Sequence, residues 1–499
     1  MPQNVIVVGA GPSGLVVAAE LARSGVEVTV FERRADPVQS RAGTILPRVL
    51  ELFDARGLAQ DFIDRAREIR PNPLFRTHMW AGMKPIEWRH LDSRYGYRLI
   101  VPQNVTEELL LKQALDAGVS VLHGHTVEHV AQNDSGVEIS AVDADGHRVT
   151  ATGGYLVGCD GGRSLVREQA GIGFSGHGAT FTGIVADIVM DNPWPEGRRI
   201  LDNDRGWLAS FPFGEGVTRF NLVHADRMHA DPAEPVTLEE VRTCLSEILE
   251  ADLDFAELRW ASRFSDATRI ADRFADGRIL LVGESVRIHY PASGVGMNFC
   301  IQDAFNLGWK LAAVVNGHAS PALLDTYESE RRPVAEALLR SVAAQCSVQF
   351  AFTPEAVAFK RWFEATLMPM PEVNRRLALE LNGLAEPYPS PAGADTMTGQ
   401  RAPDLEIQRT DGIATISELL RTQHLLVLDL TGDGRLSELA YDSAPVDVVS
   451  GVPIRLPESL RSASTLLVRP DAYLAWVGHG EQDTATVRGE IARWLDHAR

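Results

Sequence analysis

The sequence has few of the residues that build disulfide frameworks, metal centres or membrane spans. Its 499 residues include four cysteines, Cys159, Cys244, Cys300 and Cys346, and no two of them form a CxxC pair. Cysteines so widely scattered are typical of buried free thiols and predict no metal site or dithiol couple. No apolar run is long enough to span a bilayer, and the N-terminus lacks a basic segment followed by a cleavable apolar one. We therefore expect a cytoplasmic protein with no membrane partner.

Basic residues are also fewer than acidic ones. Lysine and arginine total 48 against 67 aspartates and glutamates, a formal net charge of −19. This balance argues against a surface for nucleic acids or anionic membranes, and it is typical of simple solubility. With 45% hydrophobic residues over this length, the chain can bury large cores, and we expect about three domains.

The first motif is a glycine-rich turn between two apolar runs. The β-branched residues 5–8 lead into Gly9-Ala10-Gly11-Pro12-Ser13-Gly14, and after a helical pattern a second apolar run ends at Glu32. The pattern predicts strand, helix and strand in order. Gly9 permits the tight turn, Gly11 lets the backbone approach a pyrophosphate, and Gly14 lets the helix pack close to the strand. An acid at position 32 accepts hydrogen bonds from a ribose, so we predict a dinucleotide site.

A second stretch, residues 171–176, matches the same glycine pattern and serves as an internal control. It follows a predicted helix at residues 164–170 instead of a strand, and no helical pattern begins after it. No phosphate cradle is expected in that context. We therefore predict one dinucleotide fold, so a nicotinamide cofactor would bind without a Rossmann domain of its own.

Two further apolar strands each end in a turn that carries an acid. Residues 155–158 lead into Cys159-Asp160-Gly161, which by itself is typical of a simple turn. Residues 278–282 lead into Gly283 and Glu284, then into Pro291-Ala292-Ser293-Gly294-Val295-Gly296-Met297-Asn298, and a helix follows at about residues 299–316. The backbone amides of Gly296, Met297 and Asn298 at that helix start favour negative charge, such as that near N1 and the C2 carbonyl of a reduced flavin.

In this order and spacing, the three motifs resemble the fingerprints of class A FAD-dependent aromatic hydroxylases, most of all the bacterial branch that modifies aromatic polyketides. The resemblance covers roughly residues 1–345 and extends to the tail. It implies an α/β fold with a Rossmann-like FAD-binding domain, an inserted β-sheet substrate domain and a C-terminal thioredoxin-like domain.

The expected domain boundaries come from the motif positions. The segments are residues 1–70, 98–170 and 277–340 for the FAD-binding domain, 71–97 and 171–276 for the substrate domain, 341–399 for helices and a Pro/Gly-rich linker, and 400–499 for the thioredoxin-like domain. A helical pattern runs over residues 331–363. The tail has no cysteine, which excludes a dithiol role and leaves packing or assembly.

The inserted domain has short strands and several aromatic residues. Strands are expected at residues 182–189, 206–213 and 218–224. Four aromatic side chains are candidates for the wall of a substrate cavity, with ordinary sheet core as the alternative for each: Trp207, Phe211, Phe213 and Phe220.

The resemblance assigns FAD contacts to residues of all three motifs and to two positions outside them. These are Gly9, Gly11, Pro12, Ser13 and Gly14 in the phosphate turn, Glu32 and Arg33 at the adenosine end, Arg41 and Gln103 from neighbouring segments, Asp160 with Arg163, Gly283 with Glu284, and Pro291, Gly294, Gly296, Met297 and Asn298 around the flavin ring. Taken singly, Arg41 and Gln103 also fit a surface salt bridge or a strand-edge polar contact.

The sequence departs from the family pattern at two places. The family usually has aspartate after the third-motif glycine and histidine three residues later, where this chain has Glu284 and Arg287. Ser293 and Val295 stand where glycine and glutamine are common. These departures bear on the placement and mobility of the flavin more than on FAD binding itself.

The resemblance also implies a monooxygenase reaction that depends on the cofactor. NADPH or NADH reduces FAD, O₂ adds at the flavin C4a carbon, and the resulting hydroperoxide transfers oxygen to an electron-rich aromatic ring. The protein orients the ring, excludes water and stabilises flavin charge, so no catalytic side chain and no metal ligand is predicted.

Two alternatives stay open at this stage. The same cofactor supports a Baeyer–Villiger insertion of oxygen into a ketone or quinone, and the departures at Glu284, Ser293 and Val295 suggest a flavin-binding scaffold with impaired turnover. An NAD-dependent dehydrogenase is disfavoured by the second and third motifs. The sequence leaves open the aromatic substrate, the choice between NADPH and NADH, and the number of subunits.

Overall fold

The computed structural model of the chain describes residues 4–36, 42–190, 199–214, 216–253, 255, 257–439 and 445–495. Of the positions singled out above, Arg41 and the side chains of Phe211 and Phe213 lie outside this description. Within these ranges, no helix combines the length and the apolar character needed to cross a membrane.

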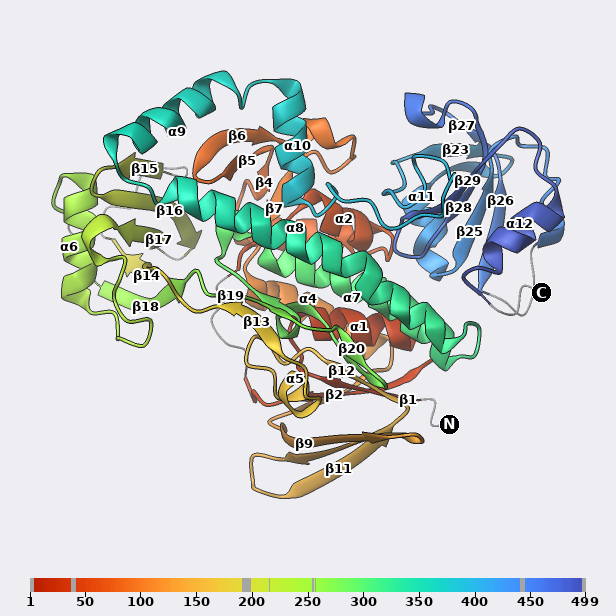
Figure 1. Cartoon of the computed structure of the whole chain (residues 1–499), viewed down its shortest axis with the longest axis horizontal. Coiled ribbons are helices and arrows are strands. Elements are labelled where there is room, and N and C mark those ends of the chain that lie inside the picture. The colour runs from red at the N-terminus through yellow and green to blue at the C-terminus, as the bar shows by residue number, and fades with distance from the viewer. Residues whose placement is uncertain are drawn as a thin grey trace.

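A six-stranded sheet with the order β20-β21-β12-β1-β2-β8 forms the centre of the N-terminal part of the fold (Figure 1). Its strands are β1 (Asn4–Val8), β2 (Glu27–Glu32), β8 (Ser120–His123), β12 (Tyr155–Gly158), β20 (Ala275–Asp276) and β21 (Ile279–Leu281). Every pair is parallel except β20 with β21. The carboxyl ends of β1, β2, β12 and β21 therefore lie at one edge of the sheet, where ligands bind in open α/β folds.

Helices cover this sheet and connect its strands. They are α1 (Pro12–Arg23), α2 (Pro47–Asp54), α3 (Ala59–Ile69), α4 (Gln103–Asp116), α5 (Leu165–Gln169) and α7 (Gly296–Val315), and α1 packs against both α7 and α4. Two small antiparallel sheets accompany them, β9 (Thr126–Asn133) with β10 (Gly136–Val142) and β11 (Arg148–Gly153), and β3 (Thr44–Ile45) with β7 (Arg98–Ile100) and β4 (Leu74–Phe75). The sheet and helices share one hydrophobic core.

The inserted part is built on a five-stranded antiparallel sheet with the order β15-β16-β17-β14-β18. Its elements are β14 (Thr182–Val189), β15 (Arg199–Asn203), β16 (Gly206–Gly214), β17 (Val217–His224), β18 (Glu257–Ser265) and α6 (Leu238–Leu249), which packs on one face. Three predicted strands are present here within one residue of their expected ends. A hairpin of β5 (Thr77–Trp80) and β6 (Met83–Glu87), and a sheet of β13 (Phe174–His177), β19 (Thr268–Ala271) and β22 (Arg287–Ile288), complete this region.

The helical pattern over residues 331–363 corresponds to two helices in the structure, with a break at residues 350–353. Helix α8 (Asp325–Gln349) begins earlier and passes through Pro333 without ending, whereas α9 (Pro354–Thr366) begins with its own cap. The Thr353 hydroxyl accepts a hydrogen bond from the Ala356 amide. Pro354 occupies the first helical position, where a backbone N–H would have no partner within the helix, so the missing N–H of proline costs nothing. α8 runs diagonally across the molecule, and α10 (Pro371–Leu381) follows α9 (Figure 1).

The C-terminal part forms a separate α/β unit at one side of the molecule (Figure 1). Its main sheet has the order β26-β25-β28-β29, with β25 (Leu425–Asp429) parallel to β26 (Val446–Ser450) and antiparallel to β28 (Ala463–Val468), which pairs with β29 (Leu474–His479). The remaining elements are β23 (Glu406–Arg409), β24 (Gly412–Thr415), β27 (Val452–Pro453), α11 (Ile416–Leu419) and α12 (Thr484–Ile491). The architecture confirms the predicted α/β fold with a Rossmann-like domain, an inserted sheet and a C-terminal unit.

Candidate active site

The glycine-rich turn after β1 has a different steric reason at each glycine. Gly9 has a φ of +103°, and its amide donates to the Phe31 carbonyl oxygen across 2.8 Å. A Cβ at Gly14 would lie 1.9 Å from the Gly9 carbonyl oxygen, so α1 packs directly on the turn. A Cβ at Gly11 would meet no atom within 4 Å. The turn is therefore closed on its inner side and open at Gly11, beside the N-terminus of α1, as a pyrophosphate requires.

Glu32 at the end of β2 is buried and held from both sides. Its Oε2 accepts from the Ala10 amide at 2.7 Å, and its Oε1 accepts from the backbone amide and Nε of Arg34 at 2.8 and 2.9 Å. Burial opposes ionisation, but the hydrogen bonds from Arg34 and Ala10 outweigh it and hold the pKa of Glu32 below its usual range. Arg33 is exposed. The sequence analysis named Arg33 and missed Arg34. Because side chains alternate between the two faces of a strand, Arg34 lies on the same side as Glu32 and Arg33 on the opposite side, and this signal was available in the sequence.

The second motif lies directly beside the first. The Cys159 amide donates to the Val8 carbonyl at 2.8 Å, and a Cβ at Gly9 would lie 2.4 Å from the Cys159 carbonyl oxygen. The Asp160 carboxylate accepts from the Ser164 hydroxyl at 2.5 Å and from the Val166 amide at 3.1 Å, which caps α5. Burial raises the pKa of Asp160, against the effect of these hydrogen bonds. Arg163 in the same turn is exposed.

The third motif closes the same edge of the sheet. Gly283 has a φ of +75°, and a Cβ there would lie 2.6 Å from the Ser13 Oγ, so this turn contacts the first turn of α1. The Ser285 hydroxyl donates to the Gly158 carbonyl at 2.7 Å and joins the third motif to the second. Glu284 between them is exposed. Segments that are more than a hundred residues apart in the sequence thus form one continuous surface.

Helix α7 begins at Gly296, three residues earlier than the sequence pattern indicated. Gly296 and Met297 are its first two residues, so their amides have no carbonyl of an earlier turn to bond. The expectation for the Asn298 amide is wrong, because that amide donates to the Val295 carbonyl at 2.9 Å. The buried Asn298 side chain instead accepts from the Leu46 amide at 2.7 Å and donates to the Thr44 carbonyl at 3.0 Å. Its role is to tie the helix start to β3.

The loop before α7 places a histidine against the helix start. A Cβ at Gly296 would lie 3.5 Å from Cε1 and Nε2 of His289, and the His289 Nδ1 lies 2.6 Å from the Tyr290 carbonyl oxygen, to which it must donate. Burial, reinforced by nearby Arg287, lowers the pKa of His289 to about 4. The ring is therefore neutral at neutral pH. In the same loop Pro291 and Gly294 are exposed, and Met297 is half-buried.

Arg287, which stands where the family usually has histidine, is buried and paired. Its Nη1 donates to the Asp303 carboxylate at 2.5 Å, and Arg331 Nε donates to the other oxygen of that carboxylate at 2.7 Å. Asp303 lies two turns into α7 and Arg331 on α8. This departure from the family pattern therefore joins β22 to two helices.

Gln103 is the first residue of α4 and lies close to the loop that precedes β3. Its amide donates to the Ala42 carbonyl at 3.0 Å, and its Nε2 donates to Glu107 at 2.8 Å. Gln103 thus has one partner in the loop before β3 and another on its own helix.

A cluster of aromatic rings lies between the inserted sheet and the loop before α7. The centroid of Tyr290 is 5.3 Å from Phe350, 5.8 Å from Phe181 and 5.6 Å from Phe264, and Trp207 is 6.1 Å from Phe350. We call these five residues the aromatic cluster. Of the side chains suggested for a cavity wall, Trp207 belongs to this cluster. Phe220 instead packs in the core under α6, which is the ordinary sheet-core alternative.

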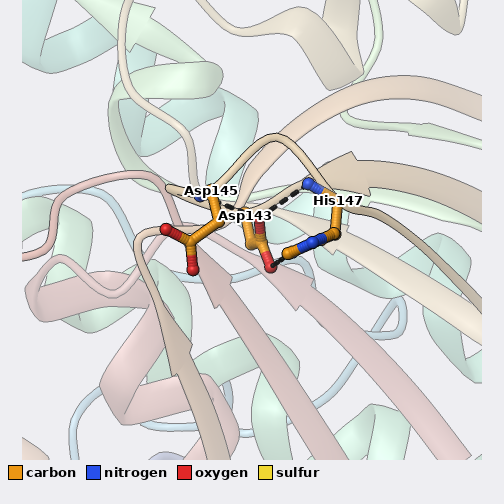
Figure 2. Close-up of side chains that lie close together, drawn as sticks. All are labelled: Asp143, Asp145 and His147. Carbon is orange, nitrogen blue, oxygen red and sulfur yellow. Dashed lines mark hydrogen bonds and ion pairs between the residues drawn. The ribbon is translucent and has the colours of Figure 1, made fainter.

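One group of potential metal ligands lies in the turn between β10 and β11. Asp143, Asp145 and His147 approach one another there, on the rim of the small sheet (Figure 2). Asp143 accepts from the amides of Asp145 and His147 at 2.9 and 2.8 Å and lies 3.1 Å from His147 Nδ1. These contacts are those of a polar side chain that stabilises a hairpin turn, so the group is explained without an ion.

Together the three motifs fit a bound FAD on steric and electrostatic grounds. Gly11 leaves open space beside the N-terminus of α1, a buried ionised Glu32 ends the adjacent strand, and the start of α7 presents two backbone amides. Burial raises the pKa of Cys244, Cys300 and Cys346 to about 12, so these three side chains offer no reactive thiolate.

Comparison with known proteins agrees with this geometry. The model of the FAD binding domain matches residues 3–342, and that of the aromatic-ring hydroxylase C-terminal domain matches residues 395–498. The chain is 38% identical to a 12-dehydrotetracycline 5-monooxygenase/anhydrotetracycline 6-monooxygenase from Streptomyces rimosus, over 99% of both chains.

Solved structures give the same result. An anhydrotetracycline hydroxylase from Streptomyces rimosus has a TM-score of 0.88 at 36% identity and covers 99% of both chains. An aromatic hydroxylase from angucycline biosynthesis has a TM-score of 0.88 at 34% identity and covers 100% of both chains. From its motifs, its fold and these matches, the chain belongs to the FAD-dependent aromatic-ring hydroxylases and is a flavin monooxygenase.

Proposed function

We propose that this monooxygenase hydroxylates a polycyclic aromatic polyketide, with NAD(P)H as the electron donor and O₂ as the oxygen source. The observation that carries the proposal is the convergence of Gly9–Gly14, Asp160 and Gly283 on one edge of the sheet, next to the start of α7. The names of its relatives, which act on anhydrotetracycline or belong to angucycline biosynthesis, support a polyketide substrate. The need for NAD(P)H supports a cytoplasmic setting.

In this proposal the backbone does most of the cofactor binding. The amides at the start of α1 and the space over Gly11 hold the pyrophosphate, and Glu32 accepts hydrogen bonds from the adenosine ribose. Asp160, Gly283 and Glu284 line the path toward the ribityl chain. The amides of Gly296 and Met297 stabilise negative charge at the pyrimidine edge of the flavin. When bound, FAD supplies the electron transfer and oxygen activation that no side chain provides.

The aromatic cluster serves the substrate in this proposal. Tyr290 lies immediately before Pro291, so the cluster adjoins the loop that faces the flavin. Tilted and edge-on rings give a planar substrate apolar surfaces on more than one side, and they exclude water from the reacting ring. The chain orients the substrate and shields it, and it needs no nucleophile or metal ligand for that task.

The test uses the full-length protein with FAD, NADPH and a panel of polycyclic phenols under ¹⁸O₂. A product heavier by one oxygen atom, labelled from ¹⁸O₂ and still carrying all its carbocyclic rings by NMR, supports the proposal. A ring-expanded product would instead show oxygen insertion into a ketone. Binding of FAD with no substrate-stimulated oxidation of NADPH across the panel would contradict the proposal.

The domain division predicted from the sequence also remains a proposal. The FAD-binding domain would comprise residues 1–70, 98–170 and 277–340, and the unit at residues 400–499 would act by packing, since it contains no cysteine. Limited proteolysis that cuts first between residues 386 and 399 supports a domain boundary before residue 400.

A further inference from the structure

Ser293 adopts a backbone conformation that L residues avoid. Its φ is +53° and its ψ is 8°, in the left-handed region, and it is buried in the loop between Pro291 and Val295. A side chain in this region crowds its own backbone, and glycine is the residue that accepts it without strain. The surrounding structure must offset the strain of a serine in this conformation. The hydrogen bonds of Ser293 therefore show what holds the loop in place.

Three partners hold Ser293 in place. Its hydroxyl lies 2.9 Å from the Met79 carbonyl oxygen and 3.0 Å from the Gln345 Oε1, and it donates its one hydrogen between them. Its carbonyl oxygen accepts from His78 Nε2 at 2.7 Å. All four residues are buried. We call His78, Met79, Ser293 and Gln345 the Ser293 clasp.

The partners of Ser293 belong to elements on the substrate side. His78 and Met79 lie on β5, and Gln345 lies near the end of α8. Gln345 Oε1 also accepts from the Ala81 amide at 3.1 Å, in the hairpin turn between β5 and β6. In that turn a Cβ at Gly82 would lie 2.8 Å from Trp207 Nε1. The clasp therefore borders the aromatic cluster, and Phe350 of that cluster follows α8 directly.

On its other side the clasp holds the loop that leads into α7. Ser293 lies between Ala292 and Gly294, and the free amides of Gly296 and Met297 follow three and four residues later. The carbonyl of Ala292 accepts from the Val295 amide at 3.3 Å, so the loop passes into the helix without an extended linker. A change in the position of Ser293 is therefore passed to the helix start.

We propose that Ser293 is a positioning residue whose hydroxyl fixes the loop before α7 to β5 and α8, and so links the wall of the substrate side to the flavin-facing helix start. This rests on the proposed function for the identity of the two sides. The hydroxyl holds the loop in place before FAD binds, which lowers the ordering cost of binding. It also makes the position of the flavin edge depend on the packing of β5 and α8.

Two substitutions of Ser293 distinguish the effect of its hydroxyl group from the effect of its backbone strain. Ser293→Ala removes the hydrogen bonds and keeps the strained conformation, whereas Ser293→Gly removes the same bonds and relieves the strain. If the hydroxyl positions the loop, both variants exchange the amide hydrogens of residues 292–297 about fivefold faster in the FAD-free protein, and both bind FAD about fivefold more weakly. The Gly variant keeps its melting temperature, so its loss of FAD affinity does not come from unfolding.

A second pair of substitutions tests the partner. Gln345→Leu removes the acceptor with little change in volume, and we expect the same faster exchange and a shifted visible spectrum of bound FAD. Gln345→Glu keeps an acceptor oxygen, so its amide exchange and the visible spectrum of its bound FAD should resemble those of the wild type. Ser347→Ala is the matched control, because Ser347 is exposed on the same helix and its hydroxyl contacts the Ala344 carbonyl.

The proposal is overturned if exchange in residues 292–297 and the dissociation constant of FAD change by less than about twofold in both Ser293 variants. A more stable Ser293→Gly protein with unchanged FAD binding and spectrum would show that Ser293 is only a source of strain. These readouts do not depend on turnover. The proposed function fails separately, if the wild-type protein binds FAD and gives no oxygenated product.

Discussion

Arg469 of the C-terminal unit and Glu330 of α8 form a buried two-point ion pair. Nη1 and Nη2 of Arg469 donate to Oε1 and Oε2 of Glu330 at 2.7 and 2.8 Å, and Lys310 of α7 donates to the same carboxylate at 2.7 Å. Burial opposes the charge, but Arg469 and Lys310 outweigh it and lower the pKa of Glu330 to about 2. The C-terminal unit is thus joined to α7 and α8 by charge, and to α7 by apolar contact as well.

Removing the carboxylate of this pair should destabilise the whole protein. In Glu330→Gln, Lys310 loses its ion-pair partner inside the protein, whereas Arg469 keeps its pair with Asp471, and we expect a loss of about 3 kcal/mol in the free energy of unfolding. Guanidinium unfolding monitored by tryptophan fluorescence measures it. Glu458→Gln, which breaks the exposed pair with Arg461, should cost less than about 0.5 kcal/mol. Equal effects of the two changes would contradict this assignment.

His289 should make the protein sensitive to mild acid. Its pKa in the folded protein is about 4, below its ordinary value of 6.5. Between these values the unfolded chain binds a proton that the folded protein does not, so stability falls as the pH drops from 6.5 toward 4. His289→Asn removes this contribution, and the melting temperature of the variant should decline less over that window. Parallel curves for the two proteins would show that His289 titrates normally.

Gly11 and Gly14 should separate cofactor binding from folding. Gly11→Ala adds a methyl group to open space at an ordinary φ of −72°, so the apoprotein should melt within about 2 °C of the wild type. The same methyl group obstructs the approach of a pyrophosphate, and FAD should bind about tenfold more weakly or worse. Equilibrium dialysis against FAD checks this.

Gly14→Ala is the counterpart, because its Cβ would lie 1.9 Å from the Gly9 carbonyl oxygen. We expect it to lose about 3 kcal/mol of stability or more, and to accumulate as insoluble protein. Normal folding of Gly14→Ala would mean that α1 does not pack on the turn as described.

Arg34 should affect FAD binding through Glu32. In Arg34→Met the Glu32 Oε1 loses the side-chain donor at 2.9 Å, so the carboxylate is less firmly placed and its pKa rises. We expect FAD to bind about fivefold more weakly. Arg33→Met is the comparison: Arg33 is exposed, the family resemblance assigns it to the adenosine end, and we expect a smaller loss of FAD affinity there. A larger effect from Arg33 than from Arg34 would reverse this order.

The parts of the site that depend on local backbone geometry were predictable from the sequence. Glycine at position 9 is needed for a positive φ, and an apolar run followed by an acid at position 32 places that acid at a strand end. The start of α7 was less predictable, because a loop of proline, serine and glycine residues precedes it and apolar spacing does not show where the first turn forms. The side-chain role of Asn298 depends on β3, which apolar periodicity did not indicate.

What the sequence by itself determined is the set of short-range signals: the glycine-rich turn, the order of strands and helices, and the absence of cysteine from the C-terminal unit. The tertiary structure alone decided which polar groups meet, as with Arg469 and Glu330, 139 residues apart, and Ser293 and Met79, 214 residues apart. The physical reason is that a turn or helix is fixed by steric limits within a few residues. A buried ion pair or the Ser293 clasp exists because the packing of whole elements removes water from groups that must then pair with each other.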